Sequence, residues 1–233
     1  MPQLIAMVIV VVGAMIYMFQ TFGGTGDKIE GIAQKTSVIT EINNIKNGLK
    51  LAARSEDINT TETTDPVSGI TTSVVTTLKG LADLKYFAEQ MNDQIATNTV
   101  TGMVAEDNYN VLNAYNAISF GGTDTNPGGM FVSLVADKKN AIPGIYVSFD
   151  FTNSSLKESG GFLESQIAND LKDIAYIDRT ALSPKSGALD RTSDTDKSQI
   201  AKRTPKDNGE QGTVSDGRFI IYFKDFGSNE VVK

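Results

Sequence analysis

Residues 4–19 read LIAMVIVVVGAMIYMF, and no charged side chain occurs before Asp27. Every residue of this run is apolar except Gly13, so a helix formed by it presents apolar side chains on all sides. A helix over residues 2–22 would be roughly 30 Å long, which matches the hydrocarbon thickness of a bilayer. The run therefore predicts a helix that is buried either in a membrane or among other apolar helices.

A secretory signal peptide is the first alternative for this segment. Such a peptide has a positively charged start and a small-residue cleavage site, whereas Lys28 is the first cation of the chain. An initiator methionine is usually removed when proline follows, yet Met1 precedes Pro2. We therefore expect Met1 to be a processed N-terminus exposed by removal of a leader. A chain that begins at its start codon is the alternative.

Glycines interrupt the apolar helix. Glycine costs about 1 kcal/mol in a helix interior, so Gly23, Gly24 and Gly26 are expected to weaken or melt the helix and act as a hinge. Gly13 instead allows a neighbouring helix to approach closely.

An amphipathic helix is predicted over residues 27–55. Asp27 is a suitable N-cap, and Glu30 follows three residues later, as in a capping box. Apolar residues then recur mostly at spacings of three, four and seven, which is the pattern of one buried helix face: Ile29, Ile32, Ala33, Ile39, Ile42, Ile45, Leu49, Ala52 and Ala53. A membrane anchor does not require this second half, whereas a subunit whose helix packs outside the bilayer does.

The rest of the chain mixes helix and strand signals. Helical spacing predicts helices over residues 78–95 and 162–174, and more weakly over 107–117. Alternating runs predict strands at 130–135, 145–151 and 218–226, the first two joined as a hairpin, and a short strand at 72–76 in a threonine-rich loop. Residues 183–217 form a long polar stretch.

These signals predict an α+β fold. We expect a long N-terminal hydrophobic and amphipathic helix packed on a mainly antiparallel β-sheet, with additional helices. The chain divides into residues 1–26, the exposed hydrophobic helix and hinge, and residues 27–233, a globular head that includes the amphipathic half of the helix.

The composition excludes several kinds of chemistry. The 233-residue chain has no His and no Cys, which excludes imidazole and thiolate catalysis and disulfides. Its net charge of −7 argues against a general nucleic-acid binder. We predict no enzyme, cofactor or metal site, and interpret the aspartates at 190, 194 and 196 as a solvated loop. Asn59 and Asn153 are weak candidates for N-glycosylation.

The layout resembles a bacterial type IV pilin, and is most similar to the type IVb branch. The resemblance rests on the uncharged run, its amphipathic continuation and the α+β head. It is clear over residues 1–55 and architectural beyond them. In that family a leader is removed, the new N-terminus is often methylated, and the hydrophobic helices bundle into a filament core.

The resemblance implies a structural subunit of an extracellular pilus-like filament that serves adhesion, motility, aggregation or DNA transfer. Its partners would be copies of itself in an open helical polymer, a surface or cell receptor and, before assembly, the inner membrane and the pilus assembly machinery. Nucleic acid is not expected as a direct, specific partner. The side chains implied to pack in the filament core are Leu4, Ile5, Met7, Val8, Ile9, Val11, Val12, Met15, Ile16, Phe19 and Phe22.

Three features depart from the family pattern. Ile5 replaces a glutamate that in the family pairs with a neighbour's N-terminal amine, so docking must rely on apolar packing, or the amine finds Gln3 or a carbonyl. Glycines 23, 24 and 26 take the place of a proline near position 22. The stretch 160–214 has no cysteine for the usual disulfide.

Three other functions are alternatives. One is a single-pass membrane protein with an external binding domain. Another is a minor pilin or secretion pseudopilin that does not form long fibres. The last is an archaeal pilin or archaellum subunit, although the β-sandwich heads typical of those proteins fit poorly with the helical patterns of this chain.

Overall fold

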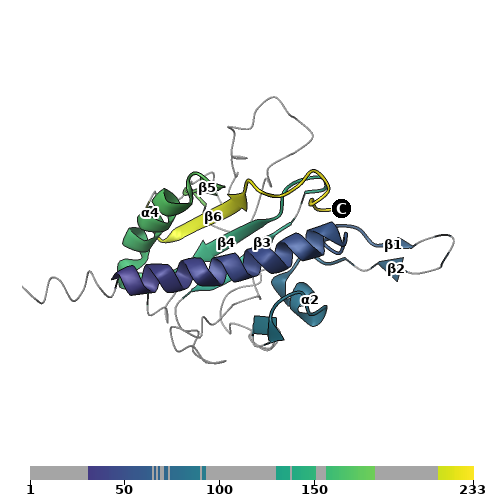
Figure 1. Ribbon diagram of the computed structural model, residues 1–233, viewed down its shortest axis with the longest axis horizontal. Helices are drawn as coiled ribbons and strands as arrows, with labels where there is room; N and C mark the ends of the chain where they lie inside the picture. Colours follow the sequence, from purple (N-terminus) through teal and green to yellow (C-terminus); the bar gives the residue numbers. More distant parts are fainter. Residues whose placement is uncertain are drawn as a thin grey trace, which may run out of the picture.

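A computed structural model describes residues 31–64, 66, 68, 71–72, 74–89, 91–92, 130–136, 138–150, 156–181 and 215–233. Within them the fold is α+β with an antiparallel sheet, as predicted. A long helix over residues 31–54 crosses the head in front of the sheet (Figure 1). The helix predicted over 107–117 lies outside the described residues, as does the apolar segment 1–26.

Four strands form the main sheet in the order β3–β4–β6–β5. They are β3 (Phe131–Val135), β4 (Gly144–Ser148), β5 (Ala175–Asp178) and β6 (Arg218–Phe223). All neighbouring strands pair antiparallel, and β3 and β4 form the predicted hairpin. Because β4 and β5 both run antiparallel to β6, they are parallel to each other. The connection between them contains helix α4 (Gly160–Leu171), as a parallel crossover usually does.

Strands β3, β4 and β6 are buried on both faces. Every residue of β3 and β4 is buried, and so is every residue of β6 after Arg218. The alternation of buried and exposed positions that the sequence suggests is therefore absent. Strands covered on both faces have near-continuous apolar runs instead, and sequences such as RFIIYF in β6 are of that kind.

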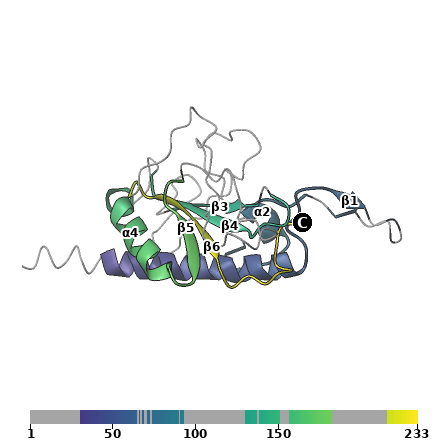
Figure 2. The ribbon, with the colours of Figure 1, turned by 90° about the horizontal axis from the view of Figure 1, so that it is seen from above.

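The long helix packs most of its predicted apolar face into the core. The predicted positions that are buried are Ile42, Ile45, Leu49, Ala52 and Ala53. Ile39 is half-buried, Ile29 lies outside the described residues, and Val38, which the pattern did not include, is buried. Its first turns meet α4 instead, where the Phe162 ring covers Gly31 and Lys35 Nζ lies 2.8 Å from Asp170 Oδ2. Ile32 and Ala33, predicted on the buried face, are consequently exposed. Figure 2 shows the helix along one side of the sheet, with α4 near its residue-31 end.

The helix predicted over residues 78–95 is much shorter. Helix α2 covers only Leu78–Asp83, and Lys85 adopts a left-handed φ of 64°, which ends the helix. Phe87 then enters the core against Gly48 of the long helix, where a Cβ atom would lie 2.3 Å from the ring. The prediction is wrong for residues 84–88, where the apolar spacing continues through a turn that leaves Leu84 51% exposed. Residues 89, 91 and 92 are helical again, and residues 93–95 lie outside the described part.

The remaining elements are short. In the threonine-rich loop, β1 (Thr63–Thr64) pairs with β2 (Thr71–Thr72). The sequence predicts a strand at 72–76, whereas β2 begins at Thr71 and ends at Thr72. A 3₁₀ turn, η2 (Lys157–Ser159), precedes α4. The sequence predicts a helix to residue 174, but α4 ends at Leu171 and the unpredicted strand β5 follows.

The C-terminal residues tie distant parts of the head together. The Lys233 N–H donates to the Ile58 carbonyl at 2.9 Å, and the Thr60 N–H donates to the Lys233 carbonyl at 3.0 Å. On the other side, the Val232 N–H donates to the Ala141 carbonyl at 2.9 Å. The last residues therefore bridge the end of the long helix and the β3–β4 turn.

Candidate functional site

Most of the predicted site residues lie outside the described part of the chain. These are Met1, all the filament-core side chains from Leu4 to Phe22, the glycines Gly13, Gly23, Gly24 and Gly26, and Asn153. Among the described helices, none is long and apolar enough to cross a bilayer.

Asn59, the described glycosylation candidate, is buried. Its backbone forms a β-bridge with Val75, and its side chain has a buried Nδ2 atom without a hydrogen-bond partner. A glycosyltransferase needs that nitrogen in solvent. The folded head therefore does not offer Asn59 for modification.

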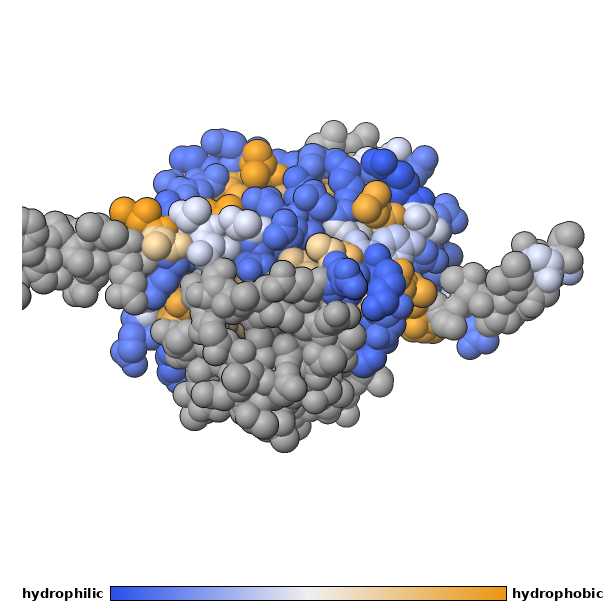
Figure 3. Space-filling view, turned by 60° about the horizontal axis from the view of Figure 1, so that its bottom comes forward, coloured by the Kyte–Doolittle hydropathy of each residue, from blue (hydrophilic) through white to orange (hydrophobic). Residues whose placement is uncertain are grey.

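One end of the head carries an exposed apolar pair. Ile32 and Phe162 are 57% and 51% exposed, and the Phe162 ring lies against Gly31, the residue before Ile32. Figure 3 shows apolar surface at this end of the head, where the described part of the long helix begins. The uncharged residues 1–26 precede this end in the chain.

A buried carboxylate connects α4 to the strands on either side of the long polar stretch. Glu164 is fully buried, and its Oε1 accepts from Arg179 Nε at 2.7 Å and from the Ser215 N–H at 2.9 Å. Its Oε2 accepts from the Gly217 N–H at 2.8 Å. The Arg179 guanidinium also donates to the hydroxyls of Ser165 and Ser215, both at 2.9 Å. We call Glu164, Ser165, Arg179, Ser215 and Gly217 the clasp.

The clasp closes the base of the polar stretch without a covalent bond. Arg179 lies just before this stretch and Ser215 lies at its end, and both bind the same carboxylate oxygen. Ser215 has a left-handed φ of 74°, an unfavourable conformation for a residue with a side chain. The hydrogen bond from its N–H to Glu164 compensates for that conformation. A chain without cysteine thus fixes both ends of the stretch by an ion pair and hydrogen bonds.

A second polar cluster attaches the C-terminal segment to the long helix. Asp225 Oδ2 lies 2.8 Å from Lys46 Nζ and 3.3 Å from Lys50 Nζ. Burial alone would raise the pKa of Asp225, but the hydrogen bonds and charges of the two lysines outweigh it and lower the pKa.

Glu230 completes this cluster, which we call the strap. Its Oε1 lies 2.5 Å from Arg54 Nη2, and its Oε2 accepts from the Gly227 N–H at 2.7 Å. Burial acts to raise the pKa of Glu230, but the Gly227 N–H, Arg54 and Lys50 together lower it. The strap residues are Lys46, Lys50, Arg54, Asp225 and Glu230.

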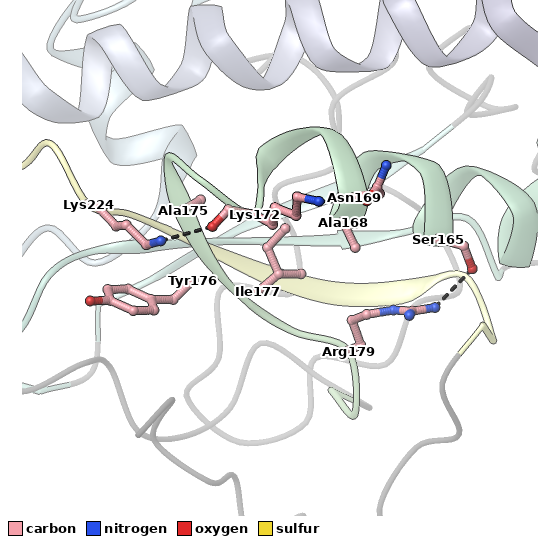
Figure 4. Close-up of a pocket in the computed structure, with 9 residues that line it drawn as sticks. All are labelled: Ser165, Ala168, Asn169, Lys172, Ala175, Tyr176, Ile177, Arg179 and Lys224. Atoms are coloured by element: carbon pink, nitrogen blue, oxygen red, sulfur yellow. Dashed lines mark hydrogen bonds between the residues drawn. The ribbon is translucent and has the colours of Figure 1, made fainter. Parts of the chain in front are cut away.

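A groove of about 450 Å³ lies between α4 and the edge strand β5. Figure 4 shows Lys224 and Tyr176 at one end and Arg179 at the other, where it reaches Ser165. Lys224 Nζ donates to the Lys172 carbonyl at 2.9 Å and lies 4.8 Å from the centre of the Tyr176 ring. The other lining residues are Ala168, Asn169, Lys172, Ala175 and Ile177.

The described residues offer no metal site. In this part of the chain, no three acidic side chains are grouped so that they could hold a metal ion. The aspartates at 190, 194 and 196 lie outside it.

In comparisons with known proteins, no family model, no curated protein and no solved structure matches the chain.

Sequence reasoning identified neither the clasp nor the groove. Glu164 and Ser215 are 51 residues apart, so nothing local relates them. One signal was present. Glu164 is a charged residue beside Leu163, and both are buried in α4. A buried carboxylate requires partners. Lys172 and Lys224 have the appearance of ordinary surface lysines, and only the path of β5 brings them together.

Proposed function

We propose that this protein is the structural subunit of an extracellular helical filament of the type IV pilus kind. Its uncharged N-terminal segment would hold it in the inner membrane before assembly and pack against copies of itself afterwards. The observation that carries this proposal is the long helix. It is amphipathic and core-packed from Val38 onward, and it is preceded in the chain by 26 residues without a charge.

The geometry of the head supports this function. The described part of the helix begins at one end of the head, beside the exposed Ile32 and Phe162 (Figures 1 and 3). An exposed apolar surface and an apolar segment of the same chain both favour burial by neighbouring copies, since burial contributes about 25 cal/mol per Å². Contacts between different surfaces of identical subunits generate open helical polymers when the rotation between neighbours does not close a ring.

Shearing of intact cells tests the proposal. We expect the sheared fraction to contain fibres visible by electron microscopy and labelled by an antibody against the head. Mass spectrometry should find Met1 as the first residue, free or methylated. A chain that is recovered only in the membrane fraction would overturn the filament and leave the single-pass membrane protein as the better explanation.

A further inference from the structure

One wall of the groove beside α4 is the edge of β5 that faces away from β6. β5 is the last strand of the sheet and pairs only with β6 among the described strands. The Ile174 carbonyl accepts from the Lys224 N–H across this pair. Because backbone groups alternate in direction along a strand, those of Tyr176 and Asp178 also face β6, and those of Ala175 and Ile177 face away. The latter two residues line the groove.

The opposite wall is α4, and Ala168, Ala175 and Ile177 supply apolar side chains to the space between the walls. Ala175, Ile177 and Arg179 alternate along the chain and share the face turned toward α4, as the bond from Arg179 to Glu164 shows. Ala168 of α4 lines the same space. A groove with a strand edge on one side and a helix on the other can accept an extended polypeptide as an additional strand.

The charges around the groove have one sign. Lys172, Arg179 and Lys224 line it, and none of its nine lining residues is acidic. Arg179 is neutralised by the buried Glu164. The contacts of the two lysines are with neutral oxygens: Lys172 Nζ donates to Asn169 Oδ1 at 3.3 Å, and Lys224 Nζ donates to helix-end carbonyls. Among the described residues, therefore, no carboxylate pairs with either of these two lysines.

We propose that this groove binds an extended, acidic polypeptide segment, which adds to the edge of β5 that faces away from β6 and places its carboxylates near Lys172 and Lys224. Backbone hydrogen bonds to Ala175 and Ile177 would supply affinity, and the lysines would select acidic strands over neutral or basic ones. The lysines also discourage unselective pairing at a short edge strand, which natural sheets commonly avoid in this way.

Nucleic acid fits the groove less well. Single strands bind by stacking bases on aromatic rings along a basic channel. Tyr176 is the only aromatic residue lining the groove, one face of its ring is covered by Lys224, and the chain carries a net charge of −7.

A synthetic peptide tests the proposal. The probe is a fluorescent octapeptide of alternating Thr and Asp, titrated with the full chain in detergent micelles and followed by anisotropy. We expect saturable binding, at least about fivefold weaker when every Asp of the probe is Asn, because surface ion pairs contribute up to about 1 kcal/mol each.

Backbone methylation separates strand addition from simple charge attraction. In an added strand, alternate N–H groups of the probe face β5. One probe is N-methylated at every Thr and a second at every Asp, and we expect only one of the two to lose binding. Equal binding of both, or equally strong competition by an acidic hyaluronate tetrasaccharide, would contradict strand addition. Absence of saturable binding would overturn the site altogether.

Two variants locate the site. Lys172→Glu should weaken probe binding at least about fivefold, since it replaces attraction by repulsion. The matched control is Lys139→Glu, an exposed lysine in the β3–β4 turn, which should leave binding unchanged. Equal loss in both variants would contradict the proposed position. The inference does not rest on polymerisation: fibres without peptide binding overturn only the groove, and peptide binding without fibres overturns only the filament.

Discussion

Glu164 is the residue on which the clasp depends. In Glu164→Gln, one acceptor oxygen becomes an NH₂ group that faces an N–H donor. We expect the free energy of unfolding to fall by about 2–3 kcal/mol, because Arg179 loses its buried counter-charge and one backbone N–H loses its acceptor. Urea denaturation measures this change. Glu158→Gln, on the exposed surface of η2, is the control and should have almost no effect.

Gly48 has a packing role that opposes helix propensity. Alanine normally stabilises a helix by about 1 kcal/mol relative to glycine. A Cβ at Gly48 would lie 2.3 Å from the Phe87 ring and 2.9 Å from the Tyr86 carbonyl. We therefore expect Gly48→Ala to destabilise the head by about 1–3 kcal/mol, measured by urea denaturation. Asn47→Ala, on the exposed side of the same turn, should be neutral or slightly stabilising; a stabilised Gly48→Ala variant would contradict the contact.

At the scale of elements, the strap makes the attachment of the C-terminal segment depend on pH. The pKa values of Asp225 and Glu230 are lowered in the folded state. Their contribution to stability is therefore complete above the ordinary carboxyl pKa of about 4, and is lost as the pH falls through the lowered values. We expect the urea midpoint to fall between about pH 5 and pH 2.

The double variant Asp225→Asn, Glu230→Gln isolates this effect. It should be less stable than the wild type at pH 6 and should lose less stability on acidification. Asp216 acts in the opposite direction, because burial raises its pKa despite the opposing charge of Arg218. Its contribution to the pH dependence should be the same in both proteins, because neither substitution changes Asp216. Parallel stability curves for the two proteins would show that the strap does not carry the pH dependence.

Elements with strong, local patterns could be predicted from the sequence. The amphipathic helix and the strands β3, β4 and β6 follow from periodicity and from runs of β-branched and aromatic residues. β5 could not be predicted, because AYID is short and follows a helical pattern directly. The end of α2 was missed because apolar spacing continues beyond it. Of the site, only the lack of a disulfide was predictable, since the clasp joins residues far apart in the chain.

At the scale of the whole molecule, assembly should depend on the N-terminal segment and not on the head surface in general. A charge at Ile16 would have to be buried among apolar helices, which is far too costly. We expect Ile16→Asp to abolish fibres in sheared fractions while the head keeps its circular dichroism spectrum. Leu51→Asp, a charge placed on the 53%-exposed Leu51 of the long helix, is the control and should still form fibres. Unchanged fibre yield in Ile16→Asp would refute packing through this segment.

The clasp also frees the head from thiol chemistry. Because the clasp consists of hydrogen bonds and one ion pair, the head needs no oxidant, no disulfide isomerase and no particular redox compartment in order to fold. Dithiothreitol should leave its melting temperature unchanged. A head of this design can complete its tertiary structure in reducing and oxidising surroundings alike, and a chain without cysteine cannot form mispaired disulfides with other molecules.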